Sequence, residues 1–172
     1  MKQSKTNSSP AKVRVYGRAQ NRTALGIVHA YMAMHPRSTL EGLRRAFPNS
    51  LNPDKGLSEN FVYAEDKGTT ANFEGYFRES DEIIEMGNGR MVAVVKMWTK
   101  SSFDRIVEAA EKYGVEVAEF EPMNKSGQKG GFRLEYINGY VPSDGRRSRQ
   151  WIWWLSAIAV LAAILLVCFL FL

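Results

Sequence analysis

The chain has 172 residues, a formal net charge of +5 and one cysteine, Cys168, so an intramolecular disulfide framework is excluded. The first ten residues lack the apolar core of a secretory signal peptide, and the length before the terminal apolar run suits one domain with short tails. Residues 1–50 carry nine Lys or Arg and only one acidic residue, so the charge that would attract an anionic partner is concentrated in the N-terminal third.

The N-terminal part combines a polar tail with a strand and a helix. Residues 1–11 predict a disordered tail, and the soluble domain is expected over 12–141. The alternation in KVRVYGR predicts a short strand at 13–16. Apolar residues at roughly helical spacing then predict a helix over 22–34, which Pro36 ends.

A second, shorter helix carries basic residues. It is expected to begin at the S-x-x-E capping box that runs from Ser38 to Glu41. Arg44 and Arg45 then lie on its outer side, and Arg37 precedes it. The helix pair resembles the start of a helix-turn-helix, so these three arginines are candidate contacts to nucleic-acid or nucleotide phosphates. A solvated basic face is the alternative interpretation.

Glycine-rich and asparagine-rich sequence separates this helix from the next β structure. Residues 49–70 are expected to form a loop with a short strand at 61–63. A hairpin with strands at 82–86 and 91–98 follows, because the Gly-Asn-Gly between them favours the left-handed conformations of a hairpin corner. The first half is therefore compatible with a winged helix in which this hairpin is the wing.

The second half predicts one helix and two further strands. Ser101 or Ser102 is expected to cap the helix SSFDRIVEAAEKYG, and Gly114 to end it. The alternating segments 115–120 and 132–137 are expected to pair as a hairpin. The predicted fold class is α+β: a small, mainly antiparallel sheet with about three helices, followed by one C-terminal transmembrane helix.

The loop between the last two strands has the materials of an anion-binding nest. It reads KSGQKGG and offers backbone amides together with the ammonium groups of Lys125 and Lys129. It lacks the residue order of a P-loop and lies between strands, so a mobile hairpin tip is the alternative.

The apolar run at 151–172 predicts a membrane-spanning helix. Its uncharged length, at about 1.5 Å per residue, covers a hydrocarbon core of about 30 Å. A basic juxtamembrane linker, 142–150, precedes it, and its arginines place the soluble domain in the cytoplasm by the positive-inside rule. The expected interface residues are Arg146, Arg147, Arg149, Trp151, Trp153 and Trp154.

The position and composition of this run suggest how it behaves in the membrane. A span at the end of a chain is inserted after translation, as in a tail anchor. Ser156, Ala159 and Ala163 recur at spacings of three and four, which favours close helix packing and self-association. The alternative is a passive anchor.

Catalytic patterns are missing from the sequence. The only histidines, His29 and His35, have no partner motif, and no metal or cofactor is expected. We therefore expect a binding protein and no enzyme. The first hypothesis is a tail-anchored protein, in a bacterial inner membrane, whose cytosolic domain binds nucleic acid or a nucleotide messenger and which oligomerises into a membrane-active effector, for example in antiviral defence. The alternative is a membrane-localised adaptor for a protein partner.

Overall fold

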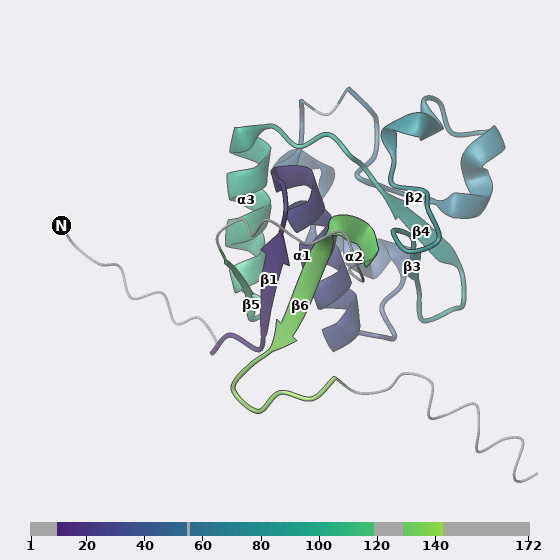
Figure 1. Cartoon of the computed structure of the whole chain (residues 1–172). Helices are drawn as coiled ribbons and strands as arrows, with labels where there is room; N and C mark the ends of the chain where they lie inside the picture. The colour runs from purple at the N-terminus through teal and green to yellow at the C-terminus, as the bar shows by residue number, and fades with distance from the viewer. Residues whose placement is uncertain (1–9, 55, 119–128, 143–172) are drawn as a thin grey trace, which may run out of the picture.

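The computed structural model describes residues 10–54, 56–118 and 129–142 (Figure 1). Within them the chain forms three α-helices and two small three-stranded sheets, mostly antiparallel, which confirms the α+β class and gives two sheets where one was expected. The helices are α1 (Gln20–Met34), α2 (Leu40–Ala46) and α3 (Lys100–Glu111). The strands are β1 (Val13–Gly17), β2 (Phe61–Tyr63), β3 (Ile84–Glu85), β4 (Met91–Val94), β5 (Val115–Val117) and β6 (Phe132–Tyr136). Short 3-10 helices are η1 (Asn49–Leu51), η2 (Ala64–Gly68), η3 (Phe73–Gly75) and η4 (Lys129–Gly131).

Strand β1 lies at the centre of the first sheet, whose order is β5-β1-β6. It runs parallel to β5 and antiparallel to β6. The expected hairpin of 115–120 with 132–137 is therefore wrong, because β1 separates the two strands. The side chains of Val13 and Val15 are fully buried, and a buried strand needs partners for its backbone polar groups along both edges. Strand β5 supplies these partners along one edge of β1, and β6 supplies them along the other.

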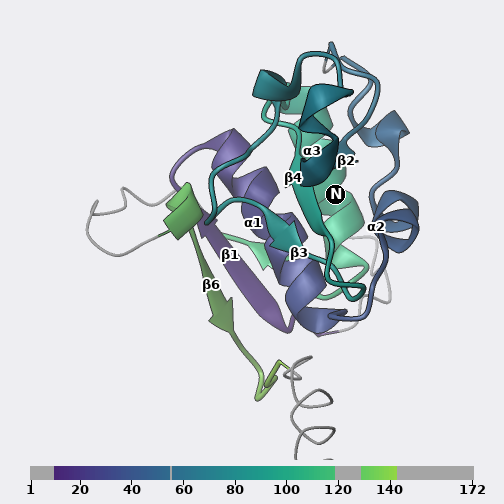
Figure 2. The same ribbon diagram turned by 90° about the vertical axis from the view of Figure 1, so that its right-hand side faces the viewer.

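Helix α1 lies between this sheet and the part of the chain that contains β3 and β4 (Figure 2). Nine of its fifteen residues are buried, on every side of the helix, as expected for a central helix. Gly26 allows the close approach to the sheet, since a Cβ at this position would lie 2.7 Å from Cγ1 of Val15. The helix begins at Gln20, two residues before the predicted start.

The second sheet has the order β2-β4-β3 and contains the expected hairpin. Its strands are shorter than predicted, and the turn places Gly89 in the left-handed region at a φ of 80°. The turn packs against the corner between α1 and α2, where the N–H of Gly87 donates to the carbonyl of Ser38. A Cβ on Gly87 would lie 2.6 Å from Cα of Arg37, so only glycine fits at this contact.

The N-cap of α2 differs from the predicted one by a single residue. Thr39 caps the helix, with its side-chain oxygen accepting from the N–H of Gly42 at 3.2 Å. Ser38 was expected in this role, but its hydroxyl lies 3.4 Å from that of Tyr31. The first side chain of the S-T pair is thus directed to α1 and the second to the helix that it begins.

Helix α3 shows the same kind of shift. Thr99 is its N-cap and accepts from the N–H of Ser102, so the expectation of Ser101 or Ser102 is wrong. The hydroxyl of Ser102 is buried and lies 2.9 Å from that of Thr99. Gly114 adopts the expected left-handed conformation at a φ of 75°, three residues after the last helical residue, Glu111.

Several predictions fall on residues outside the described ranges. The disordered tail is one, apart from its last two residues. The linker, apart from Pro142, and the transmembrane helix at 151–172 are the others. No helix in the ranges described above is long and apolar enough to cross a bilayer. The two helices and the hairpin that suggested a winged helix are present, and that comparison stays a prediction.

Candidate functional site

A groove of about 700 Å³ opens at the N-terminal end of α1. Its walls come from the start of α1, from the loop before β2, from η3 with the residue before it, and from the chain that links β4 to α3. The residues that give it its chemical character are Gln20, Asn21, Leu57, Lys96, Met97 and Trp98.

The first residues of α1 and its N-cap line this groove, and their backbone N–H groups lie at the start of the helix. Its N-cap is Ala19, which has no side chain that could accept a hydrogen bond, and its first turn holds no acidic residue. The N–H groups of Gln20 and Asn21 have no acceptor among the described residues. Unpaired amides and the helix dipole together make this end of α1 positive. The exposed Arg18 lies two residues before the helix.

The opposite wall combines apolar side chains with one cation. Trp98 is buried and donates from Nε1 to the carbonyl of Val95, while its own carbonyl accepts from Nε2 of Gln20 at 2.5 Å. The exposed side chain of Met97 lies beside it. Nζ of Lys96 donates to the carbonyl of Glu74 at 2.9 Å, which holds the ammonium group on the groove wall. Amides and an ammonium group beside apolar walls suit a ligand with an anionic part and a flat, apolar part.

The basic residues predicted on and before α2 lie at the other end of α1. Arg44 is half-buried and donates to the carbonyl of Phe61 at 3.0 Å, and its Nη2 lies 3.4 Å from a carboxylate oxygen of Glu59. Arg45 pairs with Glu41 one turn earlier at 3.1 Å. Arg37 is exposed, with no side-chain partner in the described ranges. The three do not converge, and two of them are already paired with carboxylates.

The remaining predicted site residues lie wholly or partly outside the description. The backbone of Lys129 begins η4, whereas its side chain and all of Lys125 fall outside. The N–H of Gly130 in the predicted nest donates to Asp81 at 2.9 Å, so a carboxylate of the protein already binds there. The interface and self-association residues also lie outside the described ranges: Arg146, Arg147, Arg149, Trp151, Trp153, Trp154, Ser156, Ala159 and Ala163.

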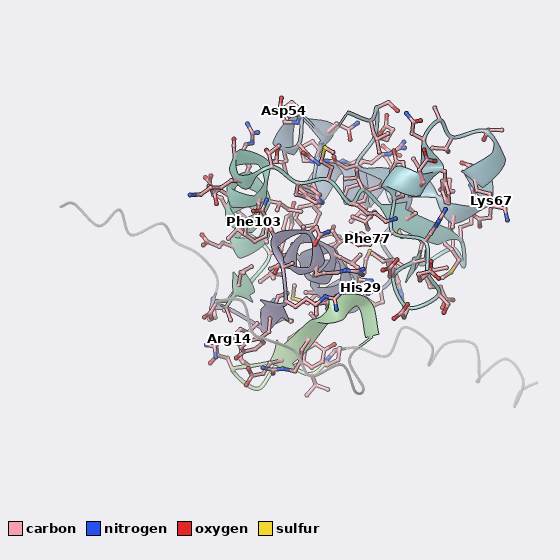
Figure 3. All side chains as sticks on the ribbon, turned by 45° about the horizontal axis from the view of Figure 1, so that its top comes forward. Arg14, His29, Asp54, Lys67, Phe77 and Phe103 are labelled. Carbon is pink, nitrogen blue, oxygen red and sulfur yellow. The ribbon has the colours of Figure 1, made fainter. Side chains whose placement is uncertain are left out.

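The outer face of the β5-β1-β6 sheet is charged but not basic. Arg14 donates two hydrogen bonds to Glu116, at 3.1 and 3.4 Å. Tyr16 donates to Glu135 at 2.6 Å, and the guanidinium of Arg133 lies 3.7 Å from the centre of the Tyr16 ring. Figure 3 shows Arg14 on this outer side, away from His29 and Phe77. Each arginine on this face has a carboxylate partner, so the face does not form an anion-binding surface.

A buried ion pair that sequence reasoning missed joins α1 to the segment before β3. Arg22 donates to Glu82 and, at 3.0 Å, to the carbonyl of Gly130. The second oxygen of Glu82 accepts from the N–H groups of Arg78 and Glu79, each at 3.1 Å. Burial acts to raise the pKa of the Glu82 carboxyl, but these hydrogen bonds outweigh it and the pKa lies below its usual value. No local signal marks this pair, since 60 residues separate its members.

His29 packs beside this pair, between α1 and β6. Its ring lies 4.8 Å from that of Phe132, and Nε2 is 3.2 Å from the carbonyl oxygen of Glu82. Burial lowers the pKa of His29 below its usual value. This contact is structural, because it joins α1 to β6 and does not open into the groove.

The described residues are nearly balanced in charge and contain no cluster of metal-binding side chains. Residues 10–54, 56–118 and 129–142 contain sixteen Lys or Arg and fifteen Asp or Glu, so most of the excess of +5 lies in the segments outside them. No group of three or more His, Cys, Asp or Glu side chains within these ranges is arranged to hold a metal ion. The groove offers donors and apolar walls, which are the elements of a binding site.

Comparisons with protein families, curated proteins and solved structures find no match to this chain.

Proposed function

We propose that this protein is a membrane-anchored binding module whose α+β domain takes a phosphate-bearing ligand, a nucleotide or the end of a nucleic acid, in the groove at the start of α1. The groove carries this proposal. Unpaired amides at the positive end of a fifteen-residue helix and the Lys96 ammonium group lie beside Leu57, Met97 and Trp98. The amides and the cation suit phosphate, and the apolar walls suit a base.

The anchor is the second half of the proposal. Residues 151–172 carry no charge and one hydroxyl residue, Ser156, and the arginines at 146, 147 and 149 favour the cytosolic side for the domain. A bacterial inner membrane fits this arrangement. Ligand binding would gather spans that carry the small-residue face of Ser156, Ala159 and Ala163. The assembly would then act on the membrane itself, a role that suits antiviral defence.

Titration of the full chain in lipid nanodiscs tests whether the domain binds a phosphate-bearing ligand. A panel of mononucleotides, cyclic dinucleotides and short oligonucleotides is added at low salt, and binding is followed by calorimetry. We expect one class to bind, with an affinity at least tenfold weaker in Lys96→Met, because Lys96 supplies the ammonium group among the described residues that line the groove. Lys100→Met is the matched control, since Lys100 is exposed and does not line the groove.

Two further arms separate the surfaces and the membrane activity. Arg45→Glu should leave binding unchanged if the ligand enters the groove, and weaken it if α2 is the contact. Vesicles loaded with dye and reconstituted with the chain should leak only when the bound ligand is present. Absence of binding across the panel, or equal losses in Lys96→Met and Lys100→Met, would remove the proposal.

The adaptor remains the second candidate, and one observation favours it. Arg14, Arg44, Arg45 and Arg133 are each paired with a carboxylate, so these four arginines leave little positive charge free for a polyanion. Such a surface suits a protein partner better than a polyanion. In that case the full chain binds no ligand of the panel and co-purifies with one protein at constant stoichiometry.

A further inference from the structure

A small aromatic surface lies at the end of the domain where the described chain stops. We call it the tyrosine surface and define it by Lys12, Tyr136, Tyr140 and Val141. Tyr136 is 42% exposed and Val141 79%, and they are two of the three large hydrophobic residues exposed in the described ranges. The rings of Tyr136 and Tyr140 lie 6.2 Å apart, and Nζ of Lys12 is 5.8 Å from the centre of the Tyr140 ring.

The backbone holds this surface in a fixed shape. After β6 the chain turns through Asn138 and Gly139, both in the left-handed region, and the N–H of Tyr140 donates to the carbonyl of Ile137 at 3.0 Å. Nδ2 of Asn138 donates to the carbonyl of Ala11 at 2.7 Å. The turn is therefore attached to the segment that enters β1, and the aromatic rings are presented by a rigid element.

The position of the surface relative to the apolar run limits what can cover it. Only residues 143–150 separate Pro142 from Trp151, and a fully extended chain of this length spans about 30 Å. With residues 151–172 in a bilayer, the tyrosine surface always lies within that distance of the lipid headgroups. Such a tether gives a high effective concentration, so even a weak contact would be occupied.

The side chains of the surface suit a lipid interface. Tyrosine has an apolar ring and a polar tip, the combination found at the level of the headgroups, and an exposed lysine interacts with anionic lipids. The linker arginines at 146, 147 and 149 add to this attraction. We propose that the tyrosine surface rests on lipid headgroups of the cytosolic leaflet and orients the domain. This inference depends on the proposed membrane anchor but not on the proposed ligand.

The orientation has a direct consequence for the groove. Strand β1 runs from the tyrosine surface to the end of the domain at which α1 begins (Figure 1). A domain seated on the tyrosine surface therefore presents the groove to the cytosol, away from the lipid.

Energy transfer from the domain to the membrane tests this orientation. Lys112 and Lys100 are exposed lysines at the two ends of α3, about 18 Å apart. Lys112 lies at the same end of the domain as the tyrosine surface. It is two residues before Gly114, whose carbonyl accepts a hydrogen bond from the N–H of Lys12. In a Cys168→Ser background, each is replaced by a cysteine that carries a donor dye, and the full chain is placed in nanodiscs with acceptor-labelled lipid.

We expect stronger transfer from position 112 than from position 100 in discs that contain phosphatidylserine. The ratio of the transfer efficiency at position 112 to that at position 100 should fall at least twofold in the variants Tyr136→Ser/Tyr140→Ser and Lys12→Gln. It should fall equally in discs of phosphatidylcholine alone. Lys67→Gln, on the exposed η2, should leave the ratio unchanged (Figure 3). The comparison of discs with and without phosphatidylserine uses the wild-type surface, so it tests the lipid contact even if the double tyrosine variant does not fold.

Three results would overturn the inference, and they are distinguishable. A ratio that responds neither to the tyrosines nor to the lipid refutes the lipid contact while leaving the anchor intact. A tyrosine effect that appears only in discs with several chains assigns the surface to contact between copies and also refutes it. Release of the wild-type chain from vesicles by alkaline carbonate refutes the membrane anchor itself, and the lipid contact with it.

Discussion

The buried pair of Arg22 and Glu82 gives the sharpest stability prediction. Replacing Glu82 by Gln leaves the Arg22 guanidinium without its carboxylate partner, at a place where the two side chains are 21% and 8% exposed. Breaking a buried ion pair in this way costs about 3–5 kcal/mol. Arg22 keeps the carbonyl of Gly130 and the ring of Phe77, 4.7 Å away, so we expect the lower end, about 3 kcal/mol.

The matched control is the pair of Arg45 and Glu41, which is also an arginine–glutamate ion pair but is exposed to solvent. Their side chains are 78% and 83% exposed, so Glu41→Gln should cost no more than about 0.5 kcal/mol. Urea unfolding of the full chain in non-ionic detergent, followed by circular dichroism, measures both. The Glu82→Gln midpoint should fall by about 1–3 M. Equal midpoints for the two variants would refute the reasoning.

The double variant and the pH dependence test the same pair further. Arg22→Met/Glu82→Gln should lose less stability than the sum of the single changes, because no unpaired charge remains. The pKa of Glu82 is lowered in the folded state, so its contribution is complete above the unperturbed value of 4.5 and is lost as the pH falls through the folded pKa. The gap between wild type and Glu82→Gln should therefore close only in acid.

Other predictions concern packing, capping and histidine. Gly26→Ala should destabilise by about 1–3 kcal/mol in the same urea assay despite the better helix propensity of alanine, because its methyl group would overlap β1, whereas Gly68→Ala, with open space around it, should be nearly neutral. Thr99→Ala should cost about 1 kcal/mol, and Ser101→Ala almost nothing; equal costs would contradict the observed cap. Because the pKa of His29 is lowered on folding, stability should decline as the pH falls below about 6.5, and this decline should be absent from His29→Gln.

The predictable parts of the fold are those that short stretches of sequence determine. The alternation at 13–16, the Gly-Asn-Gly turn and Gly114 each fix a local conformation, and all three were predicted correctly. The caps were missed by one to three residues, because adjacent Ser and Thr residues compete for the role. Sequence cannot decide which hydroxyl faces the helix and which faces a neighbour such as Tyr31.

The unpredictable parts depend on residues far apart in the chain. The last two strands appear adjacent in sequence, but the buried β1 lies between them. The groove combines the start of α1 with Lys96 and Trp98, and no local pattern brings these together. The basic character of Arg44 was misleading for the same reason, since the loop places Glu59 beside it.

The central place of β1 has a consequence for how the polypeptide is made. Tyr16 and its partner Glu135 are 119 residues apart, so the first strand to be synthesised remains without one of its neighbours until nearly the whole domain has been produced. Long-range pairing of this kind slows folding and leaves an apolar segment open to aggregation. A nascent chain interrupted before residue 132 would thus be a substrate for chaperones or proteases.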